Sequence, residues 1–184
     1  MRIIIIIILL VLHTWKGWAQ NRSDDFDDVV QYVPFASMVV MKACGVDSRD
    51  SWSKMMIKTG GAWLLSAMTT YTLKHVVKEP RADESDHYSF PSGHTAFSFA
   101  GATMLDHEYR HVSPWISVAG YGVATFTAIR RVERERHNWF DVIAGAGIGF
   151  ASAKVAFLLT DKWFKSQKVS VGCSANTIDV AIIW

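Results

Sequence analysis

Long apolar segments with helical spacing, separated by short polar stretches, are the feature that most constrains the fold of this chain. One runs from about Trp52 to Val77, and another of similar length runs from Asn138 to about Phe164. In the first, large apolar residues recur at three- and four-residue intervals, as on one face of an α-helix. The second contains small residues that favour close packing between helices: Ala144, Gly145, Ala146, Gly147, Gly149 and Ala151. We therefore expect an all-α fold, a bundle of about five to six helices.

Three further segments complete the expected bundle. Residues Val29 to Val46 are apolar and include Pro34, which predicts a bent or short helix that ends at Gly45. A second helix is expected from His94 to about His107. The eighteen uncharged residues from Val112 to Ile129 are nearly enough to cross a bilayer as a helix.

The two ends of the chain differ in composition from this helical part. Residues 1–19 have the features of a secretory signal peptide, with a positive charge at Arg2, an apolar core and small residues before a cleavage site. An uncleaved membrane anchor is the alternative. Residues 20–28 are polar and acidic, a flexible lead-in to the helical domain at 29–168, and residues 169–184 form a short irregular or strand-like tail. On this interpretation the domain is exported.

The composition favours contact with a membrane over contact with nucleic acid. Hydrophobic residues make up 50% of the chain and aromatic residues 12%, with 8 tryptophans, and such rings are common where helices meet a membrane interface. The formal net charge is only +2 and no long basic run occurs, so nucleic-acid binding has no support.

The histidines and cysteines outside the main motif do not predict a metal site. His107 and His111 are four residues apart, a spacing compatible with a metal pair, but no third ligand is placed by the sequence. We expect a solvated helix end there. Cys44 and Cys173 show no metal-ligand spacing, and a disulfide between them requires Cα atoms within about 7 Å.

The stretch from Ser89 to Thr95, which reads Ser-Phe-Pro-Ser-Gly-His-Thr, predicts an anion site. Ser92 stands at the N-cap position of the following helix, and Gly93 allows close approach of the backbone. A helix N-terminus carries unpaired N–H groups and a partial positive charge, so it attracts anions. His94 adds a proton donor at the same place. An ordinary capped helix start is the alternative.

Charged residues on both sides of this stretch form a larger pattern. Lys74 and Arg81 are separated by six residues, Arg131 and His137 by five, and His137 and Asp141 by three. Together with Pro91 to His94, these segments resemble the signature of the type 2 phosphatidic acid phosphatase and vanadium-dependent haloperoxidase superfamily.

The likeness extends from roughly Asp28 to Lys165, with two departures. Ala82 replaces the proline that usually follows the arginine, and Arg130 replaces the serine before the second arginine. Neither change removes a residue that takes part in the chemistry.

The resemblance implies a role for each residue of the pattern. His137 is the nucleophile and forms a phospho-histidine, and His94 protonates the leaving oxygen and later activates water. Asp141, one helical turn after His137, could accept the Nδ1–H of that ring. A capping box that begins at Asn138 is the alternative for Asp141, and both can hold.

Phosphate binding falls to the remaining residues. Lys74, Arg81 and Arg131 supply three positive charges, and arginine forks suit phosphate oxygens. The hydroxyl of Ser92 and the N–H of Gly93 can add neutral hydrogen bonds. We expect no metal and no cofactor, because these cations supply the electrostatic stabilisation.

The expected function is hydrolysis of a phosphoric monoester or diphosphate, with a phosphorylated lipid or a small phosphate ester as substrate. Undecaprenyl diphosphate, phosphatidate and phosphorylated lipid headgroups are candidates. A vanadium haloperoxidase is the closest alternative, although its soluble members are generally much longer chains. A non-catalytic phosphate-binding membrane protein is the other alternative.

Three apolar stretches could lie in lipid, in neighbouring helices or partly in each: Gly60 to Leu73, Val112 to Ile129 and Ala144 to Thr160. The charged site residues fall at the ends of these stretches, which places the active site at one end of the bundle. We expect an inner-membrane protein with the site facing the periplasm, or a periplasmic protein. A compact soluble bundle remains an alternative, because Lys154 interrupts one stretch.

Overall fold

A computed structural model describes residues 23–81, 86–166, 168–174 and 177–183. The described part consists of six helices and two strands, with these bounds: α2 (Ser23–Val30), α3 (Val33–Ala43), α4 (Trp52–Val77), α5 (Gly93–Tyr109), α6 (Pro114–Glu133), α7 (Trp139–Ser166), β1 (Lys168–Ser174) and β2 (Thr177–Ile183). The expected all-α bundle is confirmed. The predicted signal peptide at 1–19 and the departure at Ala82 lie outside the described residues.

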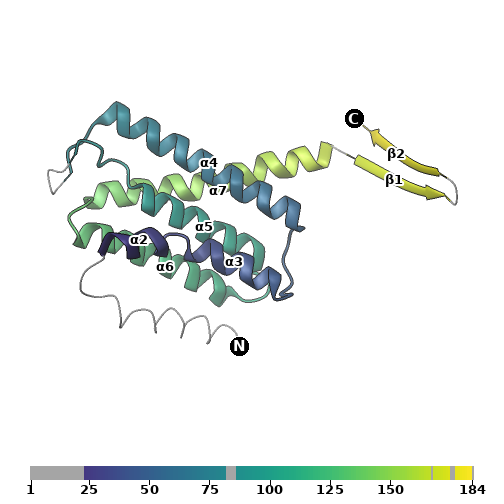
Figure 1. Cartoon of the computed structure of the whole chain (residues 1–184), viewed down its shortest axis with the longest axis horizontal. Coiled ribbons are helices and arrows are strands. Elements are labelled where there is room, and N and C mark those ends of the chain that lie inside the picture. The colour runs from purple at the N-terminus through teal and green to yellow at the C-terminus, as the bar shows by residue number, and fades with distance from the viewer. Residues whose placement is uncertain (1–22, 82–85, 167, 175–176, 184) are drawn as a thin grey trace.

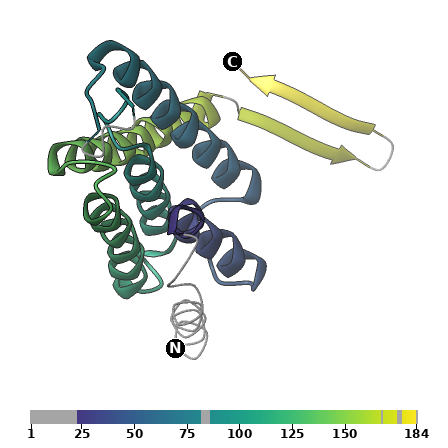
Figure 2. The same cartoon turned by 60° about the vertical axis from the view of Figure 1, so that its left-hand side comes forward.

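Helix α5 is the central helix of the bundle. It packs against α3, α4, α6 and α7, and Figure 2 shows it enclosed by these helices. Helices α4 to α7 alternate in direction, so four helix ends gather on the left-hand side of Figure 1. These are the C-terminal ends of α4 and α6 and the N-terminal ends of α5 and α7. The predicted site residues all lie at this end.

Glycines of α7 allow that helix to approach α5 closely. A Cβ added at Gly145 would lie 2.5 Å from the carbonyl oxygen of Ser92, and one added at Gly149 would lie 2.9 Å from the backbone nitrogen of Ala100. The predicted small-residue packing face is therefore confirmed at these two glycines. Gly147 differs, because a Cβ there meets nothing within 4 Å.

Capping residues explain where the long helices begin and end. The hydroxyl of Ser51 accepts the Lys54 N–H at the start of α4, and Lys78 ends that helix in the left-handed region at φ 52°. Ser92 caps α5 as predicted, so the helix begins at Gly93, one residue before the expected start. Pro114 occupies the first position of α6, where a missing N–H costs nothing.

Residues 23–28 differ from the expected flexible lead-in, because they begin helix α2. Asp27 in this helix is only 1% exposed, and it lies against three arginines at the end of α6 and directly after it. A buried carboxylate is tolerated where positive partners compensate it. Helix α2 is thus part of the packed bundle.

The C-terminal tail is strand-like, as expected. Strands β1 and β2 form an antiparallel hairpin in which Val169 pairs with Ile182 and Val171 with Val180. Cys44, between α3 and α4, is a free and exposed cysteine, so it takes no part in a disulfide.

Among the described residues, one helix is long and apolar enough to cross a membrane, and it is α7 over Trp139–Lys165. Helix α4, which contains Gly60 to Leu73, and helix α6, which begins at Pro114 and so covers most of Val112 to Ile129, do not qualify. Large apolar side chains are nevertheless exposed on these three helices: Leu64, Met68, Trp115, Val118, Phe140, Ile143, Leu158 and Leu159.

Candidate active site

A buried histidine–aspartate pair lies where α7 begins. The Nδ1 atom of His137 is 3.2 Å from the Oδ2 atom of Asp141, and both side chains are almost completely buried. The same Oδ2 atom accepts the Asn138 N–H at 3.1 Å, while the Asn138 side chain accepts the Asp141 N–H at 3.0 Å. This reciprocal arrangement is a capping box. Asp141 therefore caps the helix and contacts the histidine at once.

Ser89 is a third member of this group that the motif reasoning did not assign. Its hydroxyl donates to the Oδ2 atom of Asp141 and lies 3.4 Å from the Nδ1 atom of His137. The neighbouring Ser92 N–H donates to the backbone carbonyl of Asp141 at 3.0 Å. The loop before α5 is thus fastened to the first turn of α7. The only sequence feature that could have assigned Ser89 to the site is its position at the start of the Ser89–Thr95 stretch.

The surroundings of His137 favour its neutral form. Burial lowers the pKa of the imidazole, and the positive charges of Lys74 and Arg131 lower it further, although Asp141 opposes them. In the neutral ring, a hydrogen on Nδ1 donated to Asp141 leaves the lone pair on Nε2. That tautomer is the one a nucleophilic histidine requires.

Two of the predicted phosphate-binding cations lie beside the loop before α5. Lys74, in the last turn of α4, donates to the carbonyl oxygens of Tyr88 at 2.5 Å and Ser89 at 3.1 Å. Burial lowers the pKa of Lys74 to about 8, with help from the charge of Arg81. Arg81 itself contacts the Asp86 carboxylate at 2.8 Å. These contacts hold the loop, and the charge of Lys74 acts on the His137 ring.

Arg131 and Ser92 are both buried at the same end of the bundle. The backbone carbonyl of Arg131 accepts the His137 N–H at 3.2 Å, which ties the end of α6 to the segment that carries His137. The Ser92 hydroxyl lies 3.0 Å from the Thr95 hydroxyl and 3.5 Å from the Thr95 N–H, acting as acceptor in both contacts. Its own hydrogen can therefore still donate to an anion.

His94 lies in the first turn of α5, and its Nε2 atom is 2.6 Å from the Oδ1 atom of Asp28. Burial lowers the pKa of His94, and the charge of Arg131 acts in the same direction. The neighbouring acid of α2, Asp27, contacts Arg130 and Arg131 of α6 and Arg134, which follows that helix. Sequence reasoning missed both acids. The four-residue spacing of Phe26 and Val30 was the available sign that this stretch is helical.

The prediction of a solvated helix end at His107 is wrong. The His107 ring stacks on Phe157 with ring centroids 4.1 Å apart. Its Nε2 atom lies 3.0 Å from the Lys58 ammonium and 3.4 Å from the Asp50 carboxylate. Burial lowers the pKa of His107 to about 4. His111 instead lies near Asp47, at 3.5 Å, so the two histidines do not converge.

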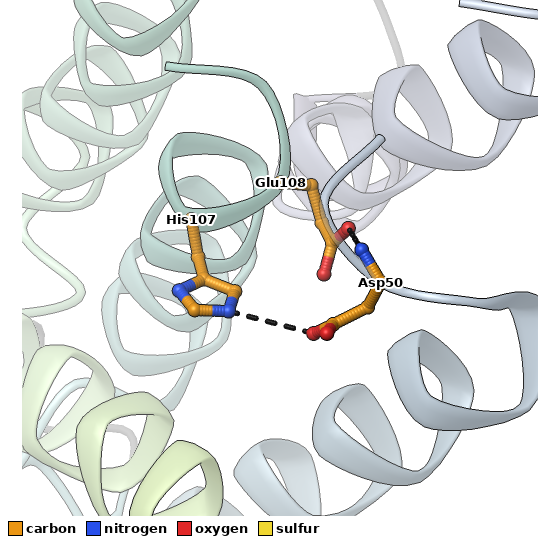
Figure 3. Close-up of side chains that lie close together, drawn as sticks. All are labelled: Asp50, His107 and Glu108. Carbon is orange, nitrogen blue, oxygen red and sulfur yellow. Dashed lines mark hydrogen bonds and ion pairs between the residues drawn. The ribbon is translucent and has the colours of Figure 1, made fainter. Parts of the chain in front are cut away.

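The buried group around His107 resembles a metal site in composition. Asp50, His107 and Glu108 present ligand atoms within 4.8 Å of one another, and Figure 3 shows the three side chains converging. The Lys58 ammonium, however, lies 2.6 Å from the Asp50 carboxylate and is only 1% exposed. This ammonium contacts two of the three side chains, Asp50 and His107, so the arrangement already contains a positive charge and is an internal ion pair network.

The model of the PAP2 superfamily matches residues 56–165, which is more than half of the chain and includes every segment of the motif. The chain therefore belongs to the PAP2 superfamily, and the resemblance inferred from the motifs is confirmed.

Named relatives act on lipid phosphates, to judge by their names. The lipid A 1-phosphatase of Porphyromonas gingivalis is 37% identical over 140 residues, which cover 76% of this chain and 32% of that protein. Lipid phosphate phosphatase 2 of Arabidopsis thaliana is 36% identical over 96 residues, 46% of this chain and 31% of that protein. The chain thus spans about a third of the length of these relatives.

Among solved structures, the crystal structure of Aquifex aeolicus LpxE is similar to this fold. The TM-score is 0.57 at 21% sequence identity, and the match covers 82% of this chain and 94% of that one. At this level of identity the similarity supports a shared fold and nothing more.

Proposed function

We propose that this chain is a phosphatase that hydrolyses a phosphoric monoester or diphosphate, with a phosphorylated lipid as substrate. The observation that carries the proposal is the buried pair of His137 and Asp141, 3.2 Å apart, at a bundle end that also collects Lys74, Arg81 and Arg131. The names of the relatives support a lipid phosphate as substrate.

The reaction proceeds in two displacements. In the first, the Nε2 atom of His137 attacks phosphorus while the bond from phosphorus to the leaving oxygen breaks, and His94 gives that oxygen a proton. Asp141 accepts the Nδ1–H and stabilises the charge that develops on the ring. In the second, His94 removes a proton from water, the water oxygen attacks phosphorus, and the bond to Nε2 breaks. Phosphate is released and both histidines return to their initial states.

Charge neutralisation is the task of the surrounding cations. Lys74, Arg81 and Arg131 bind the non-bridging oxygens of the phosphoryl group, and the charges of Lys74 and Arg131 already act on the His137 ring and lower its pKa. The hydroxyl of Ser92 and the N–H of Gly93 add hydrogen bonds at the start of α5. Preorganised donors of this kind stabilise the charge of the transition state, so we propose that turnover needs no divalent metal.

We also propose that the protein is associated with a membrane, with the site at headgroup level. The apolar length of α7 supports this proposal. Exposed tryptophans lie at both ends of the bundle: Trp139 begins α7 at the site end, while Trp52 and Trp115 lie at the starts of α4 and α6 and Trp163 near the end of α7, all at the other end. Such rings favour membrane interfaces. Export by the segment at 1–19, and a site facing the periplasm, belong to the same proposal.

The test is phosphate release by the purified full chain in detergent. Micellar lipid phosphates are compared with short-chain soluble phosphates, with His137→Ala as the inactive reference. We expect turnover that is higher on the micellar substrates and lost in the variant. Equal turnover by wild type and His137→Ala would contradict the proposal. Bromide oxidation with vanadate and peroxide, without phosphatase activity, would favour the haloperoxidase alternative.

A further inference from the structure

Helix α2 carries two adjacent acids to the candidate active site, although it lies outside the segment matched by the family. Asp27 fixes the position of this helix. Its carboxylate is 3.3 Å from Arg130, 3.6 Å from Arg131 and 3.3 Å from Arg134, all near the end of α6. Arg130 also lies over the ring of Phe26, 5.7 Å from its centroid. Figure 1 shows α2 lying across α5 and α6.

Because Asp27 anchors the helix, the next residue is held in front of His94. The Oδ1 atom of Asp28 lies 2.6 Å from the Nε2 atom of His94, across 66 residues of sequence. A carboxylate only accepts hydrogen bonds, so the Nε2 atom carries a hydrogen. The Nδ1 atom is then the one that gains and loses a proton.

We propose that Asp28 is a positioning residue for His94, so that the site contains a second carboxylate–histidine pair besides Asp141 and His137. Asp28 fixes the orientation of the imidazole, selects the nitrogen that faces the leaving group, and stabilises the protonated ring. The inference deepens the proposed function, because it assigns the group that prepares the general acid of that reaction.

The charges around His94 show why a carboxylate is needed there. Burial disfavours the protonated ring, and Arg131 of α6 disfavours it as well, so both lower its pKa. Asp28 and, more weakly, Asp27 act in the opposite direction from α2. A histidine that must give a proton to a leaving oxygen has to hold that proton first. Removing the charge of Asp28 therefore removes the main support of the acid form.

The experiment compares Asp28→Asn with a matched control, Asp47→Asn. Asp47 is an exposed acid at the opposite end of the bundle that also faces a histidine, His111, at 3.5 Å. General acid catalysis contributes roughly 10²–10⁴-fold. For Asp28→Asn we expect turnover of an alkyl phosphate to fall by on the order of 10–100-fold, because part of that contribution is lost. Asp28→Asn should turn over a nitrophenyl phosphate nearly as fast as wild type does, because that leaving group needs no proton.

The pH profile and a conservative variant distinguish a positioning role of Asp28 from a purely structural role, which would change neither result. In Asp28→Asn the activity on the alkyl phosphate declines at lower pH than in wild type, because His94 loses its proton earlier. Asp28→Glu keeps a carboxylate and recovers most of the activity. Asp47→Asn behaves as wild type in every assay, and thermal unfolding checks that all variants are folded.

A direct titration separates this inference from the proposed function. The pKa of His94, followed by NMR in the full chain with labelled histidine, falls in Asp28→Asn whether or not the protein turns over a phosphate. An unchanged His94 pKa, or equal losses on alkyl and nitrophenyl phosphates, would overturn the role of Asp28 and leave the proposed function standing. Absence of turnover by wild type on any phosphate would overturn the proposed function alone.

Discussion

Replacing Gly145 by alanine tests the packing that aligns the two halves of the candidate site. The added Cβ would lie 2.5 Å from the Ser92 carbonyl oxygen, whereas ordinary contacts begin at 3.4 Å. The difference, 3.4 − 2.5 Å, means that α5 and α7 must separate locally by about 0.9 Å. The oxygen cannot turn away, because it accepts the Ala96 N–H at 3.1 Å in the first turn of α5.

The displacement has two expected consequences. Overpacking costs about 1–3 kcal/mol, and each kcal/mol lowers Tm by roughly 2–4 °C in a chain of this size. The start of α5 also carries His94, while α7 follows His137, so the displacement misaligns these two residues, the proposed proton donor and the proposed nucleophile. A misplacement of about 1 Å costs up to roughly 10²-fold in rate.

Thermal unfolding and phosphatase assays of the detergent-purified chain measure both effects, with Gly147→Ala as the control. Gly147 is on the same helix, and a Cβ there meets nothing within 4 Å. Alanine exceeds glycine in helix propensity by about 1 kcal/mol, so this control should be slightly more stable than wild type and fully active. If Gly145→Ala is as stable and active as Gly147→Ala, the close α5–α7 contact does not align the site.

Three further predictions concern the chemistry. Wild-type activity on nitrophenyl phosphate, which needs no proton from His94, should fall as pH rises through about 8, where Lys74 loses its charge, and Lys74→Arg should retain that activity to higher pH because arginine stays protonated. His94→Ala should lose on the order of 10²–10⁴-fold on alkyl phosphates and much less on nitrophenyl phosphate, so equal losses would argue against a general acid. Activity should survive chelation by EDTA and fall with vanadate; a loss in EDTA that zinc or magnesium restores would show a metal requirement.

Features that depend on neighbouring residues in the chain could be predicted from the sequence. The bounds of α4 follow from apolar spacing and local caps, and the start of α5 follows from Ser92. The capping box of Asn138 and Asp141 is also local, since its partners are three residues apart. The family motif placed the site residues at one bundle end, because its segments fall where helices begin or end.

Features that depend on distant partners could not be predicted. Nothing near Asp28 in the sequence shows that it meets His94, 66 residues away. The same holds for Lys58, whose burial is compensated by the carboxylates of Asp50 and of Asp161, the latter at 3.0 Å on α7. The burial of His107 could not be predicted, because the aromatic ring that covers it, Phe157, comes from another helix. Gly147 shares its composition with Gly145 but faces outward, since helix rotation is set by packing.

Trapping the covalent intermediate tests the central claim, that His137 is the nucleophile, most directly. Wild type, His94→Ala and His137→Ala are each mixed briefly with a radiolabelled lipid phosphate and denatured in base. We predict protein-bound label that survives base and is lost in acid, as for a phospho-histidine, in wild type. The same label should persist longer in His94→Ala, which lacks the group that activates water. Label that remains in His137→Ala, or that is stable in acid, would contradict the account.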